Sequence, residues 1–444
     1  MRWQLLLLGV ASALTAQAQT SGDRQTPTGP HERTVVVRAN ALSLEEAWAI
    51  AEQANPTLRA VQAQQPAARG QLRDTQGLLW NNPQLATDLT RRRSTPAGVA
   101  SQSYPEWTAG VAQTFEIAGQ QGYRRRAAQL EAAALDQDIE EVRRQVRGEV
   151  ELAFTRVLAL QQRIALELEA LTTAEDSAAA VRKRVQAGED SRLEGNLSTV
   201  EAERARNQLT ILQEQLLDAR SQLAALLQLA PAMLPAVTGS VAVQPSPYTL
   251  NALLASAADR PLLKALALGE DAARNRLSLE RAAAYPDVTV GVTTGREGAL
   301  DSRERLTMLS VSVPLPLFRR NATGIGRAAS DLSRTQIERE AARRDIEARV
   351  RTLWERLASL HERVTRLSGS VLPTLTENQR LSSVAFRAGE IGLVQLLLVN
   401  RQLIDARRDY LDAFANFVET RVALEQAAGI TGEAITQRTP AKPR

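Results

Sequence analysis

The chain repeats itself once along its 444 residues, and this limits the folds open to it more than any other feature. Matching residues recur at a shift of 200 or 201 positions, and the shift drifts upstream. The pairs are Ala187-Gly188-Glu189 with Ala388-Gly389-Glu390, Val111 with Val311, Arg220 with Arg421, Leu223 with Leu424, Pro83 with Pro286 and Pro56 with Pro261. A repeat of this length indicates one structural unit built twice. We therefore expect two tandem repeats, at 41–234 and 248–430, joined by a proline-rich linker at 235–247.

Each repeat is predicted to begin with a helix and a pair of strands. Ser43 and Glu46 form a capping-box pattern, so a helix of roughly 37 residues is expected from Leu44 to about Trp80. Proline then breaks the helix in both repeats, and apolar residues alternate with polar ones beyond it. Alternation with a period of two is typical of strands. The expected strands are 84–92 and 106–116 in the first repeat, and 287–294 and 305–313 in the second.

A long helix and a returning helix follow each strand pair. Apolar residues spaced alternately by four and three positions form a heptad pattern, typical of coiled coils. In the second repeat they are Ile346, Val350, Leu353, Leu357, Leu360, Val364, Leu367 and Val371. We expect long helices at 119–187 and 321–388, the second kinked by Pro373, and returning helices at 191–229 and 391–428. Gly188 and Gly389 are expected to end the long helices at a position that requires positive φ.

The composition favours a long helical protein and argues against several chemistries. Aromatic residues make up only 4% of the chain, which is little for two compact cores, and cysteine is absent. The two histidines, His31 and His361, stand apart from each other and from any cysteine, so we expect no metal site and no cofactor. No nucleophile or nucleotide-binding motif is present, which indicates that the protein is not an enzyme. Acidic and basic residues are interleaved, which argues against nucleic acid as a partner.

The two ends of the chain are expected to lie outside the folded repeats. The apolar run Leu5–Val10 and the small residues of Ala16-Gln17-Ala18 predict a signal peptide at 1–18, with an N-terminal membrane anchor as the alternative. Residues 19–40 are expected to be extended, and 431–444 to form a flexible tail. The signal peptide predicts a protein that leaves the cytoplasm.

Four strands of nine or ten residues match the length of strands that cross an outer membrane at a tilt. Four strands alone cannot close into a barrel, and an open edge in lipid leaves backbone groups without hydrogen bonds. Three chains together would supply twelve strands, and their helices could continue the barrel as a helical tube. The alternative from the residues alone is a soluble sheet on a coiled-coil stalk.

The order of elements resembles the TolC-like outer membrane efflux proteins over nearly the whole mature chain. The segments 184–189, 192–194, 371–373 and 386–391 also resemble that family, the last two most closely its heavy-metal cation branch, the cobalt–zinc–cadmium type. The resemblance implies a mainly α fold with a small β part: a homotrimer with a 12-stranded β-barrel in outer-membrane lipid and a long coiled-coil α-helical barrel in the periplasm. It also implies a passive duct that works with a periplasmic adaptor (membrane fusion) protein and an inner-membrane pump of the RND type.

Other functions stay open at this point. A multidrug efflux channel or a type I secretion channel would share the fold. A soluble periplasmic coiled-coil adaptor is the alternative from a different class, and an exported hydrolase is the weakest alternative.

The resemblance also implies which residues act. The two tips between long and returning helices are expected to meet the adaptor; the residues are Arg184, Gly188, Glu189, Arg387, Gly389 and Glu390. The alternative is that both glycines only end helices. Relatives often carry Leu-Asp-Ala-Gln-Arg at the periplasmic gate, where this chain has Leu397-Leu398-Val399-Asn400-Arg401. The arginine is therefore kept as Arg401, whereas Leu398 replaces the aspartate. Three alternatives remain: Leu398 closes the gate by hydrophobic contact, Glu390 supplies the charge, or Leu398 only packs in the coiled coil.

Overall fold

The computed structural model of the protein describes residues 41–94, 101–239, 248–298 and 303–430. The signal peptide, the extended segment, most of the linker, the C-terminal tail and His31 lie outside these ranges. The first repeat contains α1 (Leu44–Ala54), α2 (Pro56–Gln62), α3 (Gln65–Gln76), β1 (Gln84–Ser94), β2 (Gln102–Phe115), α4 (Gln120–Ala187), α5 (Arg192–Leu226) and the short 3₁₀ helix η1 (Pro231–Met233).

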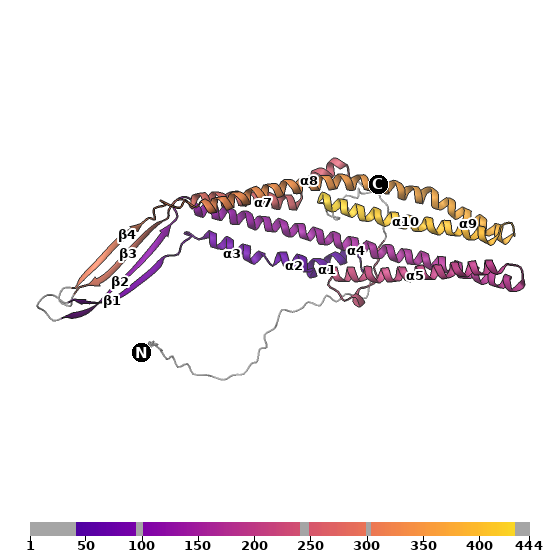
Figure 1. The fold of residues 1–444 in the computed structure, drawn as a ribbon, viewed down its shortest axis with the longest axis horizontal. Helices are drawn as coiled ribbons and strands as arrows, with labels where there is room; N and C mark the ends of the chain where they lie inside the picture. Colours follow the sequence, from indigo (N-terminus) through magenta and orange to yellow (C-terminus); the bar gives the residue numbers. More distant parts are fainter. Residues whose placement is uncertain (1–40, 95–100, 240–247, 299–302, 431–444) are drawn as a thin grey trace, which may run out of the picture. The chain divides into compact units, whose positions relative to one another are not determined.

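The second repeat follows the same order (Figure 1). It contains α6 (Leu250–Ala258), α7 (Pro261–Ala282), β3 (Val288–Glu297), β4 (Glu304–Ser312), α8 (Ala322–Arg366), the π-helical turn η2 (Leu367–Val371), α9 (Leu372–Arg387) and α10 (Leu393–Ala428). The predicted mainly helical fold with four strands and two tandem repeats is confirmed. None of the helices in the described ranges is both long and apolar enough to cross a membrane.

The single first helix expected from Leu44 to about Trp80 is wrong, because the chain forms three shorter helices there. Asn55 ends α1 and caps α2, since its side chain accepts hydrogen bonds from the backbone N–H groups of Thr57 and Leu58. Pro56 follows at the first position of α2, where its missing N–H costs nothing. The helical segment finally ends at Gln76, four residues before Trp80.

The second long helix is interrupted where proline was expected to bend it. The π-helical turn at Leu367–Val371 lies immediately before α9, and Pro373 occupies the second residue of α9. A proline cannot donate to the carbonyl four residues earlier, here that of Gly369, and its ring clashes with that carbonyl in a regular helix. The wider π turn accommodates both effects, so the helix continues beyond the proline.

The four strands form one antiparallel sheet in the order β1-β2-β3-β4, so β1 and β4 are its edges. The register aligns Leu85 with Val111, Val111 with Val292, and Val292 with Leu309. These four residues form a continuous row on one face, and all four are exposed. We call it the apolar face; the residues between them along each strand form the polar face.

Each repeat has its own hydrophobic core, to which the heptad positions of its long helix contribute. The first core packs α1, α2, α4 and α5 around Val146, Val150 and Val157. The second packs α6, α8 and α10 around Val350, Leu357 and Val364. The heptad pattern therefore identified the buried faces of both long helices.

A buried ion-pair network joins the two repeats. Glu141 on α4 is 3% exposed and accepts hydrogen bonds from Arg144 on the same helix and from Arg260 at the start of α7. Arg144 also donates to the backbone carbonyl of Gln426 near the end of α10. Burial alone would raise the pKa of Glu141, but the hydrogen bonds from Arg260 and Arg144 outweigh it and lower the pKa to about 2. This carboxylate therefore stays charged and ties α4 to the start of the second repeat through Arg260, while Arg144 ties α4 to its end.

A second buried acid near this network has the opposite shift. Glu425 lies beside Glu151 and Arg421, and burial raises its pKa to about 7; the effect of Glu151 adds to that of burial, whereas Arg421 opposes it. Burial also raises the pKa of Glu151, and Arg421 again acts the other way. The fold thus favours the neutral form of Glu425.

We predict that Glu425 makes stability depend on pH. Its pKa is raised from 4.5 to about 7, so its contribution is fully present below pH 4.5 and is lost as the pH rises through 7. The free energy of unfolding falls by about 3 kcal/mol over this pH range. Thermal unfolding between about pH 5 and pH 8 should show the wild type losing stability, and Glu425→Gln should flatten the decline. Glu419→Gln, which changes an exposed acid on α10, is the control and should leave the decline unchanged. A slope unaltered by Glu425→Gln would contradict the assignment.

Candidate functional site

The two helix tips have the same backbone geometry. Gly188 follows α4 with φ of 80°, and Gly389 follows α9 with φ of 77°. In the first tip the N–H of Glu189 donates to the carbonyl of Arg184, and that of Gly188 to Val185. The second tip has the same two bonds, from Glu390 to Ala385 and from Gly389 to Phe386. This is the Schellman motif, and the expected positive φ at both glycines is confirmed.

Arg184 connects the two tips. Its guanidinium lies 2.9 Å from Asp190 and 3.6 Å from Glu189, the acids that follow Gly188. It also lies 5.6 Å from the centre of the Phe386 ring on the other tip, a cation–π distance. Sequence reasoning selected Arg184 and Glu189 but missed Asp190 as a partner. The tips of the two repeats are therefore in contact.

The second tip leaves its polar side chains free of each other. Arg387 and Glu390 are exposed, and in the part of the chain that the structure describes neither forms an ion pair. A Cβ added to Gly389 would meet no atom within 4 Å. Space therefore does not require glycine here; only the positive φ does.

We predict that Gly389→Ala destabilises this tip by about 1 kcal/mol, because an L side chain is strained at positive φ. Hydrogen exchange at the backbone amides of Ala388 and Glu390 should be faster in this variant. Gly392→Ala is a matched control three residues away, since Gly392 has φ of –80° and equally open space. Equal exchange in both variants would contradict the role given to φ.

The gate candidates lie on α10, the helix that returns from the second tip. Leu398 is 57% exposed, so it does not pack in a core of its own chain. Arg401 is also exposed and lies 3.8 Å from Asp405, one turn further along. The sequence therefore placed both side chains correctly on a helix near the tip, and the structure leaves both accessible. Glu390 lies in the tip itself, before α10 begins.

Asp405 links Arg401 to a buried acid on another helix. It lies 3.3 Å from Arg408, and Arg408 binds Glu167 on α4 through two hydrogen bonds of 2.5 and 2.8 Å. Glu167 is fully buried. Its two bonds to one guanidinium form the bidentate geometry that makes arginine–carboxylate pairs strong. Sequence reasoning missed Asp405, Arg408 and Glu167, because 241 positions separate the last two.

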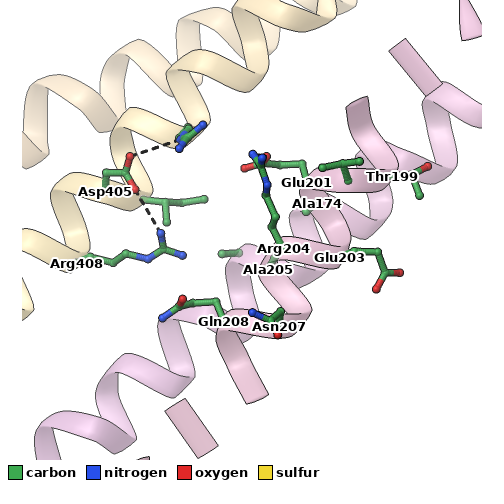
Figure 2. A pocket seen from close by; sticks show the side chains of 14 residues that line it. Ala174, Thr199, Glu201, Glu203, Arg204, Ala205, Asn207, Gln208, Asp405 and Arg408 are labelled. Atoms are coloured by element: carbon green, nitrogen blue, oxygen red, sulfur yellow. Dashed lines mark hydrogen bonds and ion pairs between the residues drawn. The ribbon is translucent and has the colours of Figure 1, made fainter. Parts of the chain in front are cut away.

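These charges border a groove of about 610 Å³ between α4, α5 and α10. Figure 2 shows Asp405 and Arg408 on α10 facing Arg204 and Gln208 on α5. The lining side chains are mainly charged or amide groups. The groove therefore carries charged side chains from both α5 and α10, and the gate candidate Arg401 lines it.

His361 lies beside Phe417 on α10. Its ring lies 5.8 Å from that of Phe417, and its Nδ1 atom is buried without a hydrogen-bond partner. Within the described ranges, no group of three or more His, Cys, Asp or Glu residues could hold a metal ion.

The sheet has one apolar and one polar face, as expected of strands in the wall of a membrane protein. Leu85, Val111, Val292 and Leu309 form the exposed row, and Trp80, Tyr285 and Phe318 are exposed just beyond the ends of the strands nearest the helices. On the polar face Glu106 is buried and pairs with Arg92 at 3.0 Å. An apolar band bordered by aromatic residues is typical of strands in outer membranes.

This sheet, joined to long coiled-coil helices, defines an outer-membrane channel that extends into the periplasm. The chain belongs to the outer membrane efflux protein family, whose model matches residues 49–228 and 253–430, one segment in each repeat. Members of this family are passive channels rather than enzymes, and they act in tripartite efflux systems with an adaptor and a pump.

Relatives and solved structures agree with this family. The chain is 26% identical to the cobalt-zinc-cadmium resistance protein CzcC of Cupriavidus metallidurans, over 97% of this chain and all of the relative. It is 25% identical to the nickel-cobalt-cadmium resistance protein NccC of Alcaligenes xylosoxydans xylosoxydans, over 80% of this chain and 79% of the relative. Its fold is similar to that of CusC, with a TM-score of 0.72 and 18% identity; the match covers 87% of this chain and 92% of CusC. It is also similar to that of VceC from Vibrio cholerae (TM-score 0.72, 17% identity, 87% and 96% covered).

Proposed function

We propose that the protein is the outer-membrane duct of a tripartite system that exports heavy-metal cations, and that three copies form one duct. The efflux family carries the channel function. The cation substrate rests on CzcC and NccC, which are both named for metal resistance; CzcC aligns over nearly the whole chain. A multidrug or a secretion channel is the alternative.

The observation that carries the trimer is the open sheet. Among the residues that the structure describes, β1 and β4 each pair on one side only, and their outer edges keep unpaired N–H and C=O groups. Each such group costs several kcal/mol in lipid, so neighbouring chains must complete the sheet. Three chains supply twelve strands, within the range of closed barrels.

We predict that the purified protein is a trimer in detergent. Light scattering coupled to size exclusion gives the protein mass of the complex, and three chains of 48.4 kDa, less the signal peptide, are expected. A cysteine pair placed across the β1 and β4 edges should crosslink between chains, whereas a pair across β2 and β3 should crosslink only within a chain. A monodisperse monomer that is stable in water without detergent would overturn the proposal.

The substrate is tested separately in cells. Deletion of the gene should lower resistance to cobalt, zinc or cadmium salts, and the wild-type gene should restore it. Loss of resistance to drugs alone would favour the multidrug alternative, and the trimer would still stand.

We propose that the helix tips dock onto the periplasmic adaptor, with an RND-type pump in the inner membrane. The contact of Arg184 with Phe386 supports this, because it joins both tips into one surface. Site-specific photocrosslinkers at Glu189 and Glu390 should capture the adaptor, whereas one at exposed Arg344 in the middle of α8 should not.

We further propose that Leu398 and Arg401 form the periplasmic gate. Both are exposed within one chain and close to the tip, and threefold symmetry would turn each into a ring of three. Closure by leucine depends little on ions, because an apolar constriction excludes water rather than binding cations.

We predict that Leu398→Asp makes conductance in planar bilayers newly sensitive to divalent cations, since a ring of carboxylates binds them. Arg401→Ala should raise the basal conductance, because the ring of charges that obstructs the mouth is lost. Leu197→Asp is the matched control: it is the equivalent exposed leucine on the returning helix of the first repeat. Unchanged conductance in both gate variants would place the constriction elsewhere, with Glu390 next to be tested.

A further inference from the structure

We propose that the apolar face of the sheet carries a binding site for a phosphate-bearing glycolipid of the outer leaflet, formed by Arg91, Arg93, Arg296 and Arg305. These residues lie on three strands at the hairpin ends of the sheet, and all four are exposed. The proposal rests on the outer-membrane location given above. It adds a lipid partner of defined chemistry.

Alternation along the strands places these arginines. Arg91 and Arg93 follow Leu85 and Leu89 at even spacing on β1, and Arg296 follows Val292 on β3. Arg305 precedes Leu309 on β4, again at even spacing. Residues two or four apart lie on one face of a sheet, so all four arginines share the apolar face.

Charge is segregated between the two faces. All acidic residues of the four strands lie on the polar face: Asp88, Glu106, Glu297 and Glu304. Of the arginines in the strands, only Arg92 lies on that face, where it pairs with Glu106. Among the described residues, no acid pairs with any of the four arginines on the apolar face. The positive charge on this face is therefore not neutralised by the described part of the chain.

Two of these arginines are direct neighbours across the sheet. The register pairs Arg296 with Arg305. Like charges directly opposite each other destabilise a strand pair. An anion bound between the two guanidinium groups would convert this repulsion into two charge-assisted hydrogen-bonded contacts, and phosphate suits the geometry of arginine.

The position of the four arginines along the strands indicates that they lie at the level of lipid headgroups. Trp107 lies directly opposite Arg296 on the apolar face, and tryptophan is typical of the boundary between lipid and water. Eight residues separate Trp107 from Phe115 at the helix end of β2, which is roughly 20 Å across the membrane for tilted strands. The helices point to the periplasm, so the arginines lie at the opposite, outer interface. Lipid A phosphates lie at this level of the outer leaflet.

The test uses the full-length protein in non-ionic detergent, with its unfolding temperature measured by differential scanning fluorimetry. Lipopolysaccharide should raise the midpoint of the wild type by roughly 5 °C. Arg296→Gln with Arg305→Gln should abolish this rise, whereas Arg296→Lys with Arg305→Lys should keep most of it. Without lipid the glutamine variant should be at least as stable as the wild type, because the repulsion between the arginines is gone.

Adjacent residues on β1 supply a matched control. Arg91→Gln changes the apolar face and should weaken lipopolysaccharide binding, whereas Arg92→Gln makes the same change one residue away on the polar face and should not. The rise is measured from each variant's own lipid-free midpoint, because Arg92→Gln also removes the partner of Glu106. Mass spectrometry of the lipid that copurifies with each variant gives a second readout.

Three outcomes would overturn the proposal: an equal rise in the glutamine variant, an equal rise with phosphatidylglycerol, or an equal rise with inorganic phosphate. The same sample gives the oligomer mass. A trimer without a specific lipid effect would refute the lipid site alone, whereas a water-soluble monomer would refute the proposed function.

Discussion

The two unpaired edges of the sheet are the constraint on which the rest of the structure depends. β1 and β4 expose a row of backbone hydrogen-bonding groups beside an exposed apolar face. Water could solvate the edges but not the face, and lipid could cover the face but not the edges. Only a membrane with further strands at both edges satisfies the two requirements together. In the proposed trimer this sheet is one third of the barrel, and the helices must leave both sheet edges free for neighbouring copies.

Within one chain, each repeat folds around its own hydrophobic core, and buried ion pairs join the two repeats. Glu141 binds Arg144 and Arg260, and Glu167 binds Arg408, so α4 of the first repeat is fixed to the second repeat at two levels. Much of the attraction in a buried ion pair offsets the loss of hydration, but separating the partners would leave an unpaired buried charge, so these pairs hold the repeats in one geometry. Here that geometry keeps the two tips together through Arg184 and Phe386.

Local signals in the sequence predicted the structural features that are set by a few neighbouring residues. Gly188 and Gly389 end their helices as expected, and the heptad positions of the second repeat are buried or partly buried. Both features follow from the conformation or spacing of neighbouring residues. The break at Asn55-Pro56 has a local signal too, a capping residue followed by proline, but the helical pattern on both sides of it favours one continuous helix. The pairing of Glu167 with Arg408 could not be predicted, since it depends on how two repeats pack. The register that places Arg296 opposite Arg305 depends on where the β3–β4 hairpin turns, which the alternation of residues alone does not fix.

Alternation along the strands gives the two faces of the barrel wall opposite electrostatic roles. Asp88, Glu297 and Glu304 lie on the polar face, which lines the lumen once the apolar face contacts lipid. Glu297 and Glu304 are directly opposite each other, as Arg296 and Arg305 are on the other side. Fixed negative charge along a pore raises the local concentration of cations without a specific binding pocket. The proposed export of metal cations would benefit from this property, since a tight site would slow their release.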